Sequence, residues 1–153
     1  MAEFELAITA TLKNEGGYVD NPSDPGGETN FGISKRSYPD VDIKNLTEEE
    51  ASAIYLRDFW KFDGIDNQML ANKVFDMSVN MGHYAIRILQ RLLSGLAVDG
   101  EYGADTEKEI NAANGFLLLI RYQKALEQHY RDIATKDPAE EKFLADWLRR
   151  AAQ

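Results

Sequence analysis

The residues of this sequence best suited to chemistry lie in one acidic, glycine-rich segment near the amino terminus. The run Asn14-Glu15-Gly16-Gly17-Tyr18 is followed, after a short interval, by Asp24-Pro25-Gly26-Gly27-Glu28-Thr29-Asn30-Phe31-Gly32-Ile33. Cleavage of a glycosidic bond needs a protonated carboxylic acid on one side of the sugar. On the other side it needs a carboxylate, or a water molecule held by one. The segment can supply both groups from a few consecutive turns of chain.

Glu15 is the candidate for the protonated acid. Apolar residues spaced as on one face of a helix predict a helix over residues 3–14; they are Phe4, Ala7, Ile8, Thr11 and Leu12. Gly16 suits the left-handed position that follows a helix end. Glu15 then lies at the negative end of the helix dipole, which disfavours an ionised carboxylate. A general acid working near neutral pH needs this preference for the protonated form.

The loop after Glu15 offers the second group. Its turn-forming residues predict a small hairpin-like excursion, which would place Asp24 and Thr29 across a cleft from Glu15. Asp24 would then orient or deprotonate a water molecule, with Thr29 as its hydrogen-bond partner. Two alternatives remain open: Asp24 only forms an Asx-turn before Pro25, or Asp20 is the second carboxylate.

This segment resembles the signature of glycoside hydrolase family 108, whose members are N-acetylmuramidases, often phage or prophage endolysins, with a lysozyme-like helical fold. The resemblance starts with Glu15-Gly16-Gly17-Tyr18 and residues 24–33. It continues through residues 55–60, 74–82, 98–103, Thr106 and 143–148, and so spans nearly the whole chain. The last third resembles the peptidoglycan-binding region that usually accompanies this family.

The resemblance implies a role for each matched residue. The family's catalytic glutamate corresponds to Glu15. The order of Glu15, Asp24 and Thr29 is similar to the triad of phage-type lysozymes, although the spacing from Asp24 to Thr29 is one residue shorter. Tyr18 and Asn80 are the expected substrate-binding residues, because an aromatic face such as that of Tyr18 can pack on a sugar ring. The implied reaction cleaves the β-1,4 bond between N-acetylmuramic acid and N-acetylglucosamine, without a metal or other cofactor.

The composition is that of a compact protein. The chain has 153 residues, of which 44% are hydrophobic and 28% charged, and it contains no cysteine. Its formal net charge of −9 argues against a nucleic-acid partner, because a nucleic-acid binder normally presents a basic surface. The same charge provides no long-range attraction to an anionic cell wall. Contact with peptidoglycan is therefore expected to be short-range.

The route to the substrate is a separate expectation. Residues 1–5 lack the basic start and apolar stretch of a signal peptide, and the longest aliphatic run, residues 116–120, is too short to span a membrane. We therefore expect a monomer with no stable membrane insertion. It would be made in the host cytoplasm and act in the periplasm or at the cell wall after holin-type release.

The apolar periodicity predicts a mainly α, lysozyme-like, two-lobed fold with a small hairpin-like loop beside the active site. Thr47 and Glu50 form a capping box that starts one helix. Asp66 is expected to cap the next, a central helix through Met81 that is apolar on most sides. Further helices are predicted from residue 84 to near 95, at 105–112, at 116–134 and from Pro138 onward. We divide the chain into a catalytic region, 1–93, and a peptidoglycan-binding-like region, 94–153, packed on it as one compact unit.

Other chemistries find little support. His83 and His129 lie outside any zinc-ligand pattern, and no G-x-S-x-G run is present. Two acidic turns lack ligands that a calcium loop requires. Tyr102 is expected in a turn where it can be exposed. The alternative to an enzyme is a non-catalytic peptidoglycan-binding or lysis-regulating protein on the same fold, and glycosidases acting on chitin-like chains are a nearer alternative.

Overall fold

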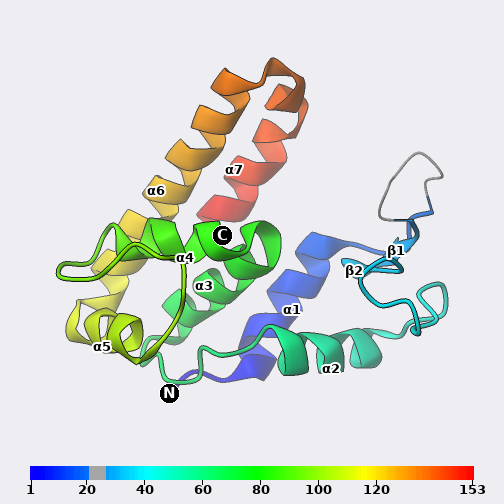
Figure 1. The fold of residues 1–153 in the computed structure, drawn as a ribbon, viewed down its shortest axis with the longest axis horizontal. Helices are drawn as coiled ribbons and strands as arrows, with labels where there is room; N and C mark the ends of the chain where they lie inside the picture. Colours follow the sequence, from blue (N-terminus) through cyan, green and yellow to red (C-terminus); the bar gives the residue numbers. More distant parts are fainter. Residues whose placement is uncertain (21–26) are drawn as a thin grey trace. The chain divides into compact units, whose positions relative to one another are not determined.

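The computed structural model describes residues 1–20 and 27–153, and this part of the chain is mainly helical, as predicted (Figure 1). It forms two compact units, one of residues 4–60 and one of residues 1–3 with 61–153. The elements of the first unit are α1 (Phe4–Glu15), β1 (Thr29–Asn30), β2 (Ile33–Ser34) and α2 (Glu48–Asp58). Those of the second unit are α3 (Gln68–Met81), α4 (His83–Gln90), α5 (Ala104–Ala112), α6 (Gly115–Lys136), the 3-10 helix η1 (Pro138–Phe143) and α7 (Leu144–Ala152).

The unit of residues 4–60 is built on the packing of α1 against α2. The face of α1 that the sequence predicted to be apolar is buried. Phe4 at its start meets the ring of Trp60 edge-on, with the ring centres 5.6 Å apart. The predicted capping box starts α2: the Thr47 hydroxyl accepts from the Glu50 amide at 3.2 Å, and the Glu50 carboxylate accepts from the Thr47 amide at 2.9 Å. The end of α1 near Glu15 and the start of α2 after Thr47 therefore lie where local sequence signals place them.

A two-stranded antiparallel hairpin joins these helices. β1 and β2 pair with Asn30 opposite Ile33, so that only Phe31 and Gly32 form the turn. Their φ angles are 50° and 77°, and positive φ at both central residues defines the type I′ turn that suits the twist of a hairpin. Buried Asn30 donates from Nδ2 to the carbonyls of Ile43, at 3.1 Å, and Leu46, at 3.3 Å. The hairpin is thereby fixed to the loop that precedes α2.

The second unit is organised around α3, which is buried on most sides as predicted. α4 and α6 pack against α3, and α7 runs beside α6 after the η1 connection (Figure 1). The buried apolar side chains of these helices include Leu70, Val74, Phe75, Met77, Ile86, Leu89, Leu118, Tyr122 and Leu126. The core of this unit therefore lies between α3 and the helices around it.

A buried ion pair links α3 to α7 within this unit. Arg150 donates from Nε and Nη2 to the two carboxylate oxygens of Asp76, at 3.0 Å and 2.9 Å. Lys73, one helical turn before Asp76, donates from Nζ to the carbonyl of Arg150 at 2.7 Å. Burial lowers the pKa of Lys73 and the Arg150 charge acts in the same direction, whereas Asp76 raises it. The charged groups of α3 thus hold the last helix in place.

The structure corrects several details of the sequence interpretation. Asn67, not Asp66, caps α3, because its Oδ1 accepts from the Leu70 amide at 2.9 Å. α4 ends at Gln90 rather than near residue 95, and Pro138 opens η1 rather than the last α-helix. Tyr102 is not an exposed turn residue: its ring packs edge-on against Phe62 at 4.8 Å.

Candidate active site

Glu15 is the last residue of α1, as predicted. The Gly16 amide closes the helix by donating to the Leu12 carbonyl at 3.2 Å, and Gly16 takes a φ of 79°. This left-handed residue turns the chain away from the helix axis. Open space surrounds the positions that a Cβ would take on Gly16 and Gly17. The Glu15 side chain itself is half-buried.

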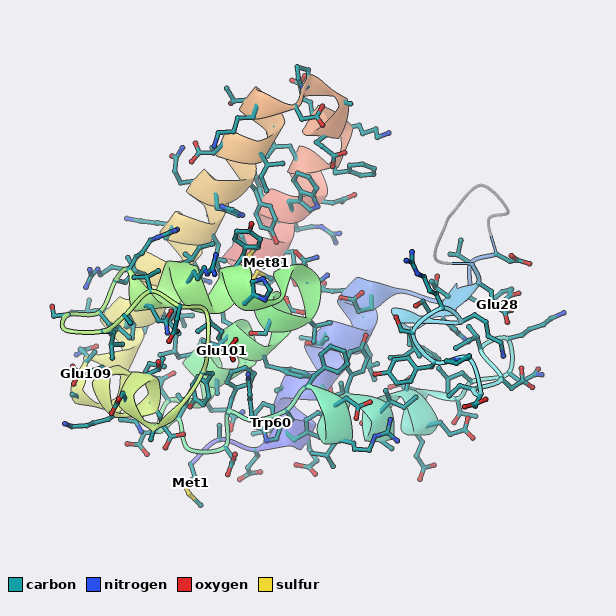
Figure 2. All side chains as sticks on the ribbon, viewed as in Figure 1. Met1, Glu28, Trp60, Met81, Glu101 and Glu109 are labelled. Atoms are coloured by element: carbon teal, nitrogen blue, oxygen red, sulfur yellow. The ribbon has the colours of Figure 1, made fainter. Side chains whose placement is uncertain are left out.

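The chain after Glu15 pairs with the hairpin. Val19 and Thr29 exchange two backbone hydrogen bonds, both of 2.8 Å. The hydroxyl of Tyr18 donates to the carboxylate of Glu28 at 3.0 Å; Glu28 is labelled beside the hairpin in Figure 2. The segment that leaves the end of α1 is therefore bonded to the start of the hairpin. Of the predicted residues, Glu15 and Tyr18 lie at the end of α1 and on this segment, and Thr29 lies on the strand paired with it.

Tyr18 combines an accessible ring with a fixed hydroxyl. Its side chain is 40% exposed. Partial burial raises the pKa of its phenol, and the Glu28 carboxylate that accepts its hydrogen bond acts in the same direction. The phenol therefore remains a protonated donor at neutral pH, and the exposed part of the ring is available to a ligand.

Gly32, in the hairpin turn, stands against Glu15. A Cβ on Gly32 would lie 2.6 Å from Glu15 Oε2 and 2.6 Å from the hydroxyl oxygen of Tyr55. These two oxygens are therefore within about twice that distance of each other. Tyr55 is on α2 and almost completely buried. The Glu15 carboxyl thus lies next to the backbone of the turn and to a buried phenol.

Phe31 is held in a strained conformation beside this carboxyl. A φ of 50° is a true outlier for a bulky side chain. Such residues persist only where the surroundings hold them, and they gather at functional sites. The hydroxyl of Tyr55 donates to the Phe31 carbonyl at 2.9 Å. A contact from α2 therefore supports the turn that faces Glu15.

A second polar cluster lies on the same unit. Asp58 accepts from Arg57 Nε at 2.7 Å and from the Tyr38 hydroxyl at 2.8 Å. The hydrogen bonds from Arg57 and then Tyr38 lower the pKa of the Asp58 carboxyl to about 2. Burial and the Asp58 hydrogen bond raise the pKa of Tyr38 to about 12. An ionised Asp58 thus ties α2 to the chain that follows the hairpin.

The remaining predicted residues lie elsewhere. Asp24 is outside the described residues, and Asp20, its competitor as second carboxylate, is exposed next to the Val19–Thr29 pair. Asn80 is on α3 of the other unit, where its Oδ1 accepts from the Tyr130 hydroxyl. Sequence reasoning missed Gly32 and Tyr55 as neighbours of Glu15. The Phe31-Gly32 dipeptide was the only local signal, and it marks a turn without showing what the turn faces.

Over residues 1–20 and 27–153, no group of three or more histidine, aspartate or glutamate side chains is arranged to hold a metal ion. None of the helices in this part of the chain has the length and apolarity needed to cross a membrane.

The comparisons with known proteins agree with the order of regions read from the sequence. Residues 8–82 match the family model described as Glycosyl hydrolase 108, and residues 84–152 match the Predicted Peptidoglycan domain. SagA of Brucella abortus has a similar solved structure, with a TM-score of 0.71 and 24% sequence identity over 97% of this chain and 93% of that one. At this identity the likeness shows the fold alone. No curated protein gives a significant match.

The family matches and the compact units divide the chain at different places. The match to the hydrolase family model ends at residue 82 and the match to the peptidoglycan domain begins at residue 84. The two compact units instead separate after Trp60. Neither boundary reports which residues catalyse and which bind. The division into a catalytic region 1–93 and a binding region 94–153 therefore stays a prediction.

Proposed function

Because the chain belongs to glycosyl hydrolase family 108, with a peptidoglycan domain after the hydrolase region, we propose that it is an N-acetylmuramidase. Its family assignment makes it a glycoside hydrolase that acts on peptidoglycan. The proposal adds the bond, β-1,4 between N-acetylmuramic acid and N-acetylglucosamine, and the acid, Glu15. The placement of Glu15 at the end of α1, against the strained turn at Phe31 and Gly32, is the observation that supports it most.

Glu15 acts as the general acid in this proposal. Its carboxyl gives a proton to the glycosidic oxygen as the bond to the anomeric carbon breaks, so that the leaving sugar departs as an alcohol. The half-buried position of Glu15 and the turn packed against it restrict the carboxyl to a narrow range of orientations. Such restriction matters because a general acid must lie within hydrogen-bond reach of the oxygen it protonates.

Asp24 and Thr29 are proposed to position the attacking water on the other face of the sugar. In this arrangement the water attacks the anomeric carbon and the configuration inverts. Direct attack by Asp24 would instead form a glycosyl-enzyme and retain the configuration. Proton NMR of the first product formed from a soluble peptidoglycan oligosaccharide distinguishes the two. A product with retained configuration would contradict the water-positioning role.

The decisive test compares the wild type with Glu15→Gln on purified peptidoglycan sacculi. Glutamine keeps the shape of the side chain but cannot donate the proton, so turbidity loss should fall by at least about 100-fold, within the range that general acid catalysis contributes. Mass spectrometry should find new reducing ends at muramic acid. Glu5→Gln, in the exposed first turn of the same helix, is the matched control and should retain activity.

Two results would contradict the proposal. Reducing ends at N-acetylglucosamine would assign a different bond. A wild type that binds sacculi but releases nothing at any salt concentration or pH would favour the non-catalytic peptidoglycan-binding or lysis-regulating alternative. The net charge of −9 gives this alternative some support.

We also propose that the protein acts as an endolysin, as a monomer, in the periplasm or at the wall after holin-type release. The family resemblance supports this role. The test is expression in a bacterial host with and without a co-expressed pore-forming holin. Lysis should require the holin, and equally rapid lysis without it would contradict this route.

A further inference from the structure

A group of aromatic and basic side chains lies on the unit of residues 61–153, on helices other than the one that carries Glu15. We call it the Tyr84 surface. Its members come from the end of α3, from α4 with the turn after it, and from the middle of α6; they are Asn80, Tyr84, Arg87, Arg91 and His129. Met81, labelled in Figure 2, marks the end of α3 where this surface begins.

Tyr84 is the centre of this surface. Half of its side chain is exposed, although it is a large aromatic residue in the first turn of a helix. Its ring stacks with the ring of His129 on α6, with centres 6.0 Å apart and planes 27° apart. The guanidinium carbon of Arg87 lies 5.8 Å from the Tyr84 ring centre. Tyrosine and arginine in such groupings are the residue types enriched where proteins bind partners.

Asn80 adds an oriented donor. The Tyr130 hydroxyl donates to its Oδ1, and this contact directs the amide nitrogen of Asn80 the other way. That nitrogen makes no hydrogen bond to any residue of 1–20 or 27–153, and the side chain is exposed. Tyr130 follows His129 directly on α6. The free donor is therefore fixed in place by the same helix that positions the aromatic pair.

Two arginines and a histidine are the basic side chains of this surface. Arg91 is exposed and forms no ion pair with the described residues. The pKa of His129 is lowered, mainly by burial. The Asp132 carboxylate opposes this shift, whereas the charges of Arg91 and Lys136 add to it. Arg87 and Arg91 thus bring two cationic side chains to this surface, with Asp99 beside Arg87 and Asp132 beside His129. Of the two guanidinium groups, that of Arg91 is the more exposed, and a guanidinium binds carboxylates at short range.

We propose that the Tyr84 surface binds the muramyl-peptide portion of peptidoglycan. The exposed part of the Tyr84 ring packs on a sugar ring, and the Asn80 amide donates to the carbonyl of an N-acetyl group. Arg91, with Arg87, binds carboxylates of the peptide stem. The identity of the ligand rests on the proposed function, since it is the same polymer, but the surface needs no catalysis. Asn80 lies in the hydrolase match and the other members in the peptidoglycan match.

The test measures binding of the full chain to intact sacculi by co-sedimentation, in the Glu15→Gln background so that the polymer is not consumed. Tyr84→Ala, Asn80→Ala and Arg91→Gln should each weaken binding about three- to tenfold, the loss expected from one net hydrogen bond or equivalent contact. Phe116→Ala removes an aromatic side chain from α6 that is 60% exposed, against 50% for Tyr84, and Arg149→Gln removes an exposed arginine from α7. Both controls should bind like the parent.

A second arm separates sugar contacts from peptide contacts. Glycan strands freed of their peptides by an amidase should bind the parent more weakly, and Arg91→Gln should then have no further effect, whereas Tyr84→Ala should still weaken binding. Circular dichroism melting confirms that each variant is folded. Unchanged binding by folded Tyr84→Ala and Arg91→Gln would overturn the proposal, and so would an equal loss in Phe116→Ala.

Failure of this inference is distinguishable from failure of the proposed function. If wild-type protein releases reducing ends but the Tyr84 surface variants bind normally, the surface proposal fails and the muramidase proposal stands. If the variants lose binding while the wild type releases nothing, the surface proposal stands and the chain binds peptidoglycan without cleaving it.

Discussion

Gly32 lies directly against Glu15: a Cβ on the turn glycine would come within 2.6 Å of the Oε2 atom of the glutamate. Two separate features of position 32 exclude a side chain. Its φ of 77° is in the left-handed region, and the neighbouring space is already occupied by Glu15 and the Tyr55 hydroxyl. The hairpin turn therefore forms one wall of the position in which the carboxyl is held.

Gly32→Ala should reduce activity far more than it reduces stability. The left-handed conformation costs an alanine about 1–2 kcal/mol, and the new methyl group must displace the Glu15 carboxyl. A displacement of about 1 Å at a catalytic group can lower the rate about 100-fold. Sacculus turbidity assays report activity, and urea unfolding reports stability. Gly17→Ala is the matched control, because open space surrounds its Cβ position and its φ is not positive; its rate should stay near that of the wild type.

Tyr55→Phe tests the support of the strained turn from α2. The substitution removes the donor to the Phe31 carbonyl, at 2.9 Å in the native structure. An unsatisfied, partly buried carbonyl should lower the free energy of unfolding by about 1–3 kcal/mol. Activity should fall as well, because the turn it releases faces Glu15. Urea unfolding measures the loss of stability and sacculus turbidity measures the loss of activity, both on the same preparation of the variant.

Tyr38→Phe provides the comparison for Tyr55→Phe. It removes a phenol hydroxyl that donates to Asp58 at an exposed position, so its effect on unfolding should be below about 1 kcal/mol. Its effect on activity should be small. Equal losses of activity in the two variants would refute a specific role for the Tyr55 contact.

The sequence predicted those parts of the site that depend on neighbouring residues. The end of α1 at Glu15 follows from a helical apolar stripe and Gly16, and the capping box of Thr47 and Glu50 follows from a three-residue spacing. These signals are read within one helical turn, so tertiary contacts did not alter them. The cap at Asn67 shows the limit of such reading. Asp66 and Asn67 are both good capping residues, and the sequence does not distinguish which of two neighbours takes the position.

The parts that sequence reasoning missed depend on contacts between distant residues. Phe31 is a poor candidate for positive φ, and its conformation is supported by Tyr55, 24 residues away. Asn80 was predicted as a substrate residue from the resemblance, but its partner Tyr130 is 50 residues further along the chain. Neither contact can be predicted from local periodicity. The periodicity of a single sequence shows which face of a helix is apolar, but not which other element that face contacts.

Breaking the buried ion pair between Asp76 and Arg150 should destabilise the second unit more than breaking an exposed pair. Asp76→Asn leaves the Arg150 guanidinium buried without its counter-charge, and breaking a buried pair in this way costs about 3–5 kcal/mol. Asp146→Asn breaks the exposed pair with Arg149, which should cost no more than about 1 kcal/mol. Urea unfolding of the two variants checks the difference. Similar losses would mean that the buried pair contributes no more than a surface contact.

The ionised Asp58 carboxylate should stabilise the folded protein at neutral pH, and this stabilisation should be lost in acid. Its hydrogen bonds with Arg57 and Tyr38 hold its folded-state pKa at about 2, below the ordinary value of 3.8. Because the folded pKa is the lower one, the stabilisation is fully present above about pH 4 and is lost as the pH falls toward 2. The measurement is urea unfolding of wild type and Asp58→Asn from pH 6 to pH 2.

The difference in unfolding free energy between wild type and Asp58→Asn should be constant from pH 6 to pH 5 and should narrow through pH 3. Tyr38→Phe removes one of the donors to Asp58 but keeps Arg57. Its difference from wild type should narrow over the same interval with a smaller amplitude, because Arg57 makes the largest contribution to the lowered pKa. A difference for Asp58→Asn that stays the same down to pH 2 would show that the carboxylate is not held in its ionised form by these contacts.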